Sequence, residues 1–237
     1  MHPRSKLVIA SSVAMVLLVG LGASAAPADQ KELKDVLHQL DLAAAGFHST
    51  SASVEFDSVQ TDPVYDKDVQ TGTVEYKRNG KAFQMAVHFL TENGKPNPKD
   101  LTYSGGKGML YEKLSNHLYV RDLTKFESYL LLGFGASGAQ LTDKWDITYL
   151  GTESLMDGKT SVKAAKLELV AKDPDVRKMF PKVTIWVDPS RAVSLKQVFD
   201  EGQGQSRTSV YSNIKLNPTL PDKDFTIETD SKTQIMR

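Results

Sequence analysis

A glycine-rich run is the first feature of this chain that could bind a ligand. Gly133-x-Gly135-x-x-Gly138 matches the pattern by which a helix N-terminus holds the pyrophosphate of a dinucleotide. That pattern works only when a strand precedes the glycines and a helix follows them. Here a helical segment is expected before the glycines and a strand, 144–151, after them. The sequence therefore argues against nucleotide binding.

Metal binding and catalysis are disfavoured on similar grounds. Asp66-x-Asp68 and Asp222-x-Asp224 lack the remaining ligands of a calcium loop. The histidines beyond the N-terminus show no metal-ligand spacing; they are His38, His48, His88 and His117. There is no cysteine, no H-E-x-x-H, no G-x-S-x-G and no phosphate-binding lysine loop. We expect no metal, no cofactor and no enzyme activity, although a carboxylate pair assembled from distant positions would leave no local pattern.

The N-terminal segment has the features of an export signal. Arg4 and Lys6 precede an apolar stretch, 7–21, and Ala23-Ser24-Ala25 has the small-x-small cleavage pattern. We expect residues 1–25 to be a signal peptide, and residues 26–237 to form a single domain exported from the cytoplasm. Because no cysteine stands at the cleavage point, the chain is not expected to be a lipid-modified lipoprotein itself.

Charge and the absence of cysteine narrow the possible partners and the fold. The chain has 29 basic and 29 acidic residues, without the basic excess of a nucleic-acid-binding protein. An exported domain without disulfides must depend on a sizeable hydrophobic core. Residues 29–47 have apolar side chains at helical spacing, and the polar face mixes acids and bases. That mixture favours a helix covering a sheet over a helix lying on a membrane surface.

The clearest local signal is the stretch 73–87, which is organised around Asn79-Gly80. This dipeptide favours a two-residue hairpin turn. Such a turn would place Arg78 opposite Lys81, Tyr76 opposite Phe83, Val74 opposite Met85 and Gly72 opposite Val87. Because strand side chains alternate, these residues would share one face, which is apolar until the two cations near the turn.

The remainder of the chain reads as short strands separated by turn signals. We expect about eleven strands, at 51–60, 72–78, 81–90, 101–104, 109–114, 118–122, 144–151, 161–171, 182–188, 193–199 and 207–216, with a loop at 93–98. Hairpin links at this spacing predict an antiparallel sheet that closes or curls strongly. The fold class is therefore mainly β (α+β), with an N-terminal helix.

One helical segment interrupts the strands. Thr124 and Glu127 have capping-box spacing, and the apolar residues of the segment are Phe126, Tyr129, Leu130, Leu131 and Phe134. The glycine run that follows predicts a flexible hinge. A helix inserted between strands in this way could be a lid over the sheet, and a helix that simply packs in place fits the pattern equally well.

Large apolar residues at alternating strand positions supply a candidate binding surface. The candidates are Val74, Tyr76, Phe83, Met85, Val87, Met109, Tyr111, Trp145, Ile147 and Ile185. Ordinary core packing accounts for most of them. A methionine on the apolar face of the hairpin favours an adaptable cavity, because its side chain is flexible.

The order of these motifs resembles that of the LolA-type carriers of outer-membrane lipoproteins. The resemblance runs through the signal peptide, the long helix, GTVEYKRNG at 72–80, YSGGKGMLY at 103–111, LLLGFG at 130–135 and NPTLPDKDF at 217–225. It covers nearly the whole exported chain. It implies an incomplete antiparallel β-barrel with helices across the concave opening. It also implies an arginine, matched here by Arg78, that holds the lid.

The resemblance further implies a function. Such a carrier binds the acyl chains of lipoproteins, receives them from an inner-membrane ABC exporter and delivers them to an outer-membrane receptor as a monomer. Two other classes stay open from the sequence, an RseB-like module that senses lipids or lipoproteins and a periplasmic hydrolase. The segment 62–68 and the loop 93–99 depart from the family pattern, so the rim of the barrel is expected to differ.

Overall fold

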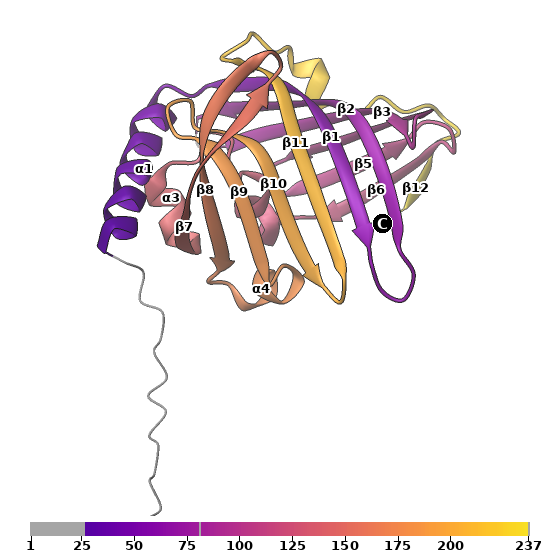
Figure 1. Ribbon diagram of the computed structural model, residues 1–237. Coiled ribbons are helices and arrows are strands. Elements are labelled where there is room, and N and C mark those ends of the chain that lie inside the picture. Colours follow the sequence, from indigo (N-terminus) through magenta and orange to yellow (C-terminus); the bar gives the residue numbers. More distant parts are fainter. Residues whose placement is uncertain (1–26, 81, 237) are drawn as a thin grey trace, which may run out of the picture.

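The computed structural model describes residues 27–80 and 82–236. The expected signal peptide lies outside these residues. One sheet of twelve strands dominates the fold, in the order β12-β6-β5-β4-β3-β2-β1-β11-β10-β9-β8-β7. All neighbours pair antiparallel except β12, which runs parallel to β6. The sheet curls into an open barrel (Figure 1), which confirms the predicted architecture.

The strands and helices have the following bounds. The strands are β1 Ser49–Gln60, β2 Asp66–Asn79, β3 Ala82–Glu92, β4 Lys95–Ser104, β5 Lys107–Glu112, β6 His117–Asp122, β7 Trp145–Asp157, β8 Thr160–Ala171, β9 Lys182–Asp188, β10 Val193–Gly202, β11 Gln205–Leu216 and β12 Gln234–Met236. The helices are α1 Pro27–Ala45, α2 Glu127–Leu130, α3 Gly138–Lys144 and α4 Pro174–Met179, with 3-10 turns η1 Thr124–Phe126 and η2 Asp222–Phe225.

The predicted hairpin register is wrong by two residues. Asn79 pairs with Ala82, Arg78 with Phe83, Tyr76 with Met85 and Val74 with Val87. Asn79 therefore belongs to β2 instead of opening the turn, and Gly80 follows it with a φ of 62°. Because the displacement is two residues, every side chain keeps its predicted face.

Other boundaries differ because long-range pairing extends or creates elements. The expected loop 93–98 shrinks to Asn93-Gly94, both with positive φ, and β4 begins at Lys95. The strand β12 was not predicted, because its pairing with β6 is parallel and joins distant positions. The expected capping box at Thr124 is absent, since the segment begins as a 3-10 turn without a side-chain cap. A capping box forms instead between Ser137 and Gln140 at the start of α3.

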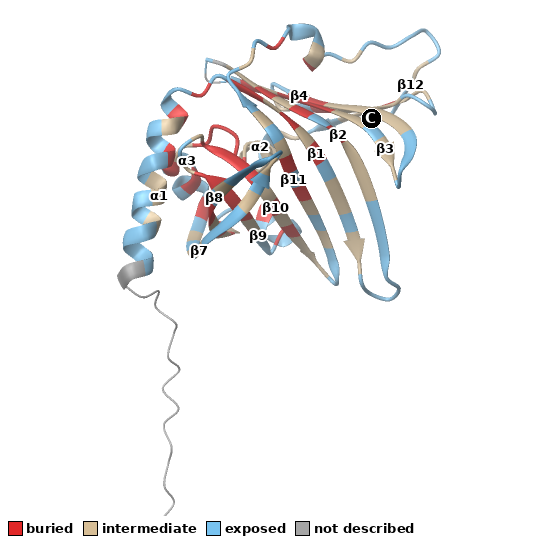
Figure 2. Ribbon diagram, turned by 45° about the horizontal axis from the view of Figure 1, so that its top comes forward, coloured by how far each residue is buried: buried red, intermediate tan, exposed pale blue. Residues whose placement is uncertain are grey.

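Two hydrophobic clusters fill the concave side of the sheet. One lies between β7–β9 and the helices, where Leu40 of α1, Leu141 of α3 and Val176 of α4 meet Leu167 and Ile185. The other gathers the inner faces of β1–β4 around Phe134. In β1 the buried positions lie in the first half, and the second half opens toward solvent (Figure 2). The helices thus pack one half of the barrel more fully than the other.

Glu75, on the convex face, has a partly buried carboxylate that affects stability. The C-terminal segment covers Ala86 with Leu220 and Phe225, and Glu75 is paired with Ala86 across β2 and β3. Glu75 Oε2 is buried without a hydrogen-bond partner among the described residues. Burial, and then repulsion by Asp224, raises the pKa of Glu75.

The raised pKa means that folding favours the protonated form of Glu75, so its ionisation destabilises the protein as pH rises through that pKa. Because solvent screens part of this effect, we expect Glu75→Gln to stabilise the protein at pH 7 by about 0.5 kcal/mol, or roughly 1–2 °C in Tm, and to give no gain at pH 4. Thermal unfolding at both pH values measures this. Glu55→Gln, at an exposed position of β1, is the control. Equal effects of the two variants at pH 7 would contradict the assignment.

Candidate functional site

A hollow of about 440 Å³ lies on the concave side of the sheet beneath α2. Its apolar wall comes from the inner faces of β2, β3 and β4, through Val74, Tyr76, Met85, Val87, Phe89 and Leu101. Tyr129 and Leu130 of α2 contribute the opposite side. The volume and the mainly apolar wall are those of a site for a small hydrophobic ligand.

The residues expected to bind ligand separate into those that line this hollow and those that do not. Val74, Tyr76, Met85 and Val87 line it. Phe83 lies beside it, stacked on Tyr103 with ring centroids 4.9 Å apart. The remaining five do not line it: Ile185, Ile147 and Trp145 belong to the cluster under the helices, and Met109 and Tyr111 lie on β5. Alternation along a strand identifies the inner face, but the fold decides which part of that face stays uncovered.

Several residues that line the hollow were not predicted from the sequence. Phe56 of β1, Leu101 of β4 and Phe199 of β10 contribute apolar surface. Alternation from Val54 would have placed Phe56 on the inner face. Residues of β10 and β11 line the hollow because β11 pairs with β1. This pairing joins Thr50 to Leu216, and no local sequence pattern predicts it.

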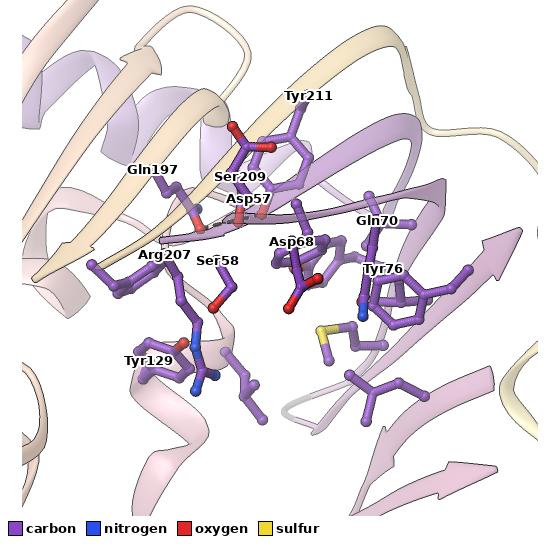
Figure 3. A pocket seen from close by; sticks show the side chains of 18 residues that line it. Asp57, Ser58, Asp68, Gln70, Tyr76, Tyr129, Gln197, Arg207, Ser209 and Tyr211 are labelled. Carbon is purple, nitrogen blue, oxygen red and sulfur yellow. Dashed lines mark hydrogen bonds between the residues drawn. The ribbon is translucent and has the colours of Figure 1, made fainter. Parts of the chain in front are cut away.

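A buried polar pair links the wall to the segment after α2. Gln197 of β10 donates through Nε2 to the carbonyl of Leu132, and accepts a hydrogen bond from the Tyr211 hydroxyl at 3.2 Å (Figure 3). Burial raises the pKa of Tyr211 and of Tyr76 well above the usual range. Both phenols therefore stay neutral at physiological pH, so the deep wall carries no charge.

The helix α2 is held at its start and is only partly buried along its length. Tyr103 of β4 donates to Glu127 Oε2 at 3.0 Å, and none of the four residues of α2 is fully buried. The ring of Tyr129 stacks on Phe180 with centroids 4.7 Å apart, and burial raises its pKa to about 12. Of the other residues expected in a lid, Phe126 packs against the cluster under the helices and Phe134 is buried in the β1–β4 cluster.

The glycine run after α2 is fixed by close packing and is not a free hinge. Residues 132–136 are all buried, and the backbone exchanges hydrogen bonds with β10, from Ser194 N to Gly133 O and from Gly135 N to Ala192 O. Gly133 and Gly135 have φ values of 72° and 70°. A Cβ at Gly133 would lie 1.7 Å from Ser194 Oγ, so only glycine fits there.

Arg78 joins this fixed segment to the N-terminal helix. Its Nη2 donates to the Gly135 carbonyl at 2.6 Å and its Nη1 to the Ala44 carbonyl at 3.3 Å. The guanidinium also lies over the Phe47 ring, 5.7 Å from the centroid. The side chain expected to hold a lid thus joins the end of α1 to the segment that follows α2, and its role in holding a lid stays a prediction.

A second hollow of about 690 Å³ lies on the other side of α2. Leu131, Leu141, Trp145 and Val176 supply its apolar surface. Adjacent residues of one short segment, Leu130 and Leu131, therefore face different hollows.

Residues 27–80 and 82–236 show neither a cluster of metal ligands nor a membrane-spanning helix. No group of three or more potential metal ligands lies together in this part of the chain. No helix in the same part is long and apolar enough to span a membrane.

Comparison with known proteins identifies the fold. No family model and no curated protein matches the sequence. Among solved structures, an uncharacterized conserved protein from Thermus thermophilus aligns with a TM-score of 0.51 and 14% identity, over 88% of this chain and 98% of that chain. MucB aligns with a TM-score of 0.50 and 12% identity, over 86% of this chain and 65% of that chain. The fold is shared with MucB.

The similarity to MucB extends to the fold alone, because identity is so low. A LolA superfamily protein from Nitrosomonas europaea aligns over 82% of this chain and 97% of that chain at 18% identity, with a TM-score of 0.41, too low to bear on the fold. The open twelve-stranded sheet with helices on its concave side is the architecture that the LolA resemblance implies.

The hydrogen bond at the start of α2 can be tested directly. We expect Tyr103→Phe to speed hydrogen exchange of the amides of residues 124–131 by about fivefold, because the lost bond contributes about 1 kcal/mol. Exchange followed by mass spectrometry measures this. Tyr119→Phe on β6 removes a hydroxyl that makes no hydrogen bond within the described part of the chain, and it should leave α2 unchanged. Unaltered exchange in Tyr103→Phe would mean that Glu127 does not fix the helix.

Proposed function

We propose that this protein is a periplasmic carrier that binds the acyl chains of lipoproteins in the hollow beneath α2 and moves them from the inner to the outer membrane. The observation that carries the proposal is an apolar cavity of about 440 Å³ whose cover, α2, contains no buried residue. In this role the protein would receive cargo from an ABC exporter and release it to an outer-membrane receptor. The proposal assigns no chemical reaction to the protein.

The energetics of such a carrier require a cover that competes with the cargo. Each buried CH₂ contributes about 0.8 kcal/mol, so a chain of about sixteen carbons offers roughly 12 kcal/mol before the costs of ordering. Complete burial would make release slow. A closed state that buries Tyr129 and Leu130 against the same wall opposes retention, because cargo must displace these contacts. Arg78 holds the segment that follows α2 in place through the carbonyls of Ala44 and Gly135, and so fixes the base from which the cover would move.

Binding of an apolar fluorescent probe to the purified protein tests the proposal first. A lipopeptide carrying acyl chains should displace the probe, and native mass spectrometry should detect lipid that copurifies with the protein. A protein that binds neither probe nor acyl chains would exclude the carrier.

The alternative is an RseB-like sensing module. Sharing the fold with MucB is compatible with either role. The sensing module would form a stable complex with the periplasmic part of a membrane protein and retain little lipid, whereas a carrier would retain lipid in the absence of any partner.

Adjacent lid leucines provide a matched pair of variants. Leu130→Gln places a polar amide against the hollow beneath α2, and we expect it to weaken binding of an apolar probe by about tenfold, equivalent to about 1.4 kcal/mol. Leu131→Gln makes the same change toward the second hollow and should leave that affinity within twofold of the parent. Fluorescence titration measures both. If the two variants lose affinity equally, ligand does not bind selectively beneath α2.

Replacement of Arg78 tests the contact between lid and helix. Arg78→Leu removes two charge-assisted hydrogen bonds, and we expect faster hydrogen exchange at residues 132–136 together with faster release of a bound acyl chain. Arg78→Lys keeps the charge but loses the two-pronged donor geometry, so its effect should be intermediate. Arg121→Leu, on the exposed end of β6, is the control. Unchanged exchange and unchanged release in Arg78→Leu would remove Arg78 from the mechanism.

A further inference from the structure

The inner face of the barrel becomes steadily less polar from the rim inward. Strand pairing aligns Asp68 of β2, Ser58 of β1 and Arg207 of β11 in one row at the rim. The next row inward holds Gln70, Phe56 and Ser209, and the third holds Gly72, Val54 and Tyr211. Successive rows are about 7 Å apart, since they differ by two residues along a strand. Charged, neutral polar and mainly apolar rows thus follow one another into the hollow.

The rim row carries one cation and one anion on either side of Ser58. All three residues line the hollow beneath α2, and Figure 3 shows Ser58 between the side chains of Arg207 and Asp68. Arg207 and Asp68 lie on β11 and β2, the two strands that flank β1, so their backbones are about 10 Å apart. Within the described residues the two side chains form no ion pair with each other.

Arg207 and Asp68 each contact one neighbouring side chain, and each has further polar atoms that could bind a ligand. Arg207 Nε lies 2.8 Å from Glu201 Oε1, and this is the ion pair that it makes among the residues described. Asp68 Oδ1 accepts a hydrogen bond from Asn93 Nδ2 at 2.7 Å. The third charged residue of the lining, Asp57, is already paired with Lys67 at 2.8 Å. Arg207 is also paired, but its Nη1 and Nη2 atoms, like Oδ2 of Asp68, make no hydrogen bond or ion pair within the described part of the chain, so these atoms can meet a ligand at the mouth.

We propose that the cavity selects lipids whose headgroup carries both a phosphate and an ammonium group, with the phosphate at Arg207, the ammonium at Asp68 and the acyl chain against Val74, Met85 and Val87. This inference rests on the proposed binding of acyl chains. A headgroup with a phosphate alone would satisfy Arg207 but meet repulsion from Asp68. A neutral headgroup would gain nothing from either residue. Arg207 and Asp68 would therefore discriminate between headgroups by repulsion as well as by attraction.

Displacement of an apolar probe by three ligands with identical acyl chains tests the inference. The ligands are phosphatidylethanolamine, phosphatidylglycerol and an acylated lipopeptide without charge in its peptide. Because the rim is solvated, we expect the parent protein to prefer phosphatidylethanolamine over phosphatidylglycerol by about two- to fivefold at low salt. The preference should shrink at high salt, which screens exposed charges.

Two variants assign the preference to the rim residues. Arg207→Gln should weaken binding of both phospholipids and leave the lipopeptide unchanged. Asp68→Asn should weaken binding of phosphatidylethanolamine and strengthen binding of phosphatidylglycerol. The controls are Arg177→Gln on α4 and Asp146→Asn on β7, which are exposed and do not line the hollow beneath α2. Circular dichroism verifies that each variant folds.

The possible results separate the inference from the proposed function. Equal affinity for the three ligands in the parent and in both variants would overturn headgroup selection while leaving the acyl-chain carrier intact. Preferential binding of the uncharged lipopeptide would overturn it as well. Failure of every ligand to displace the probe would overturn both, because the cavity would then not be an acyl-chain site.

Discussion

The pairing of β1 with β11 is the contact on which the rest of this structure depends. It joins a strand near the start of the described chain to one near its end, and so unites β2–β6 and β7–β10 in one sheet. The rows that cross this seam carry Ser58, Phe56 and Val54 of β1 opposite Arg207, Ser209 and Tyr211. Without this register, the charged rim row and the apolar rows further inward would not line the same hollow.

A sheet that curls without closing leaves its concave face to be covered by other elements. The helices α1, α3 and α4 fill the half formed by β7–β9, where Ile185, Leu167 and Leu169 are fully buried. The other half is covered by the four-residue helix α2, by Phe47 after α1 and by the ring of Phe134, which stacks on Tyr76 at 4.1 Å. The hollow beneath α2 follows from this unequal distribution of cover.

Sequence pattern and structure agree where local periodicity decides the outcome. All eleven expected strands are present, and the helix over 29–47 corresponds to α1. The hairpin faces were predicted correctly although the register was not, because a shift of two residues preserves alternation. Trp145 and Ile185 have the same strand-type pattern as Met85. Only the placement of α1 and α3 decides that they belong to a packed core.

The parts that could not be predicted depend on contacts between distant residues. The strand β12 exists through pairing with β6, and the rim row exists through pairing of β11 with β1. The glycine run was expected to be a hinge because glycine is permissive. Here its freedom is used to bring Gly133 and Gly135 against Ser194 and Phe47, where a Cβ would clash. A run of glycines can mean a flexible backbone, which allows motion, or a close approach to neighbouring atoms, which prevents it. The sequence alone does not distinguish the two.

The fixed glycine segment changes how access to the hollow is achieved. A lid that swung on a hinge at 133–138 would have to break the β10 contacts of Gly133 and Gly135, the hydrogen bond from Gln197 and those from Arg78. Movement confined to η1 and α2 leaves those contacts in place. It breaks the Tyr103–Glu127 bond, the exposed Lys125–Asp175 ion pair and the packing of Phe126, Tyr129 and Leu130. Short segments with few buried contacts open locally at much lower free energy than the whole fold. The barrel can therefore stay intact while its cover opens. Under the proposed function, the seven residues of η1 and α2, and not the stability of the sheet, would govern exchange of cargo.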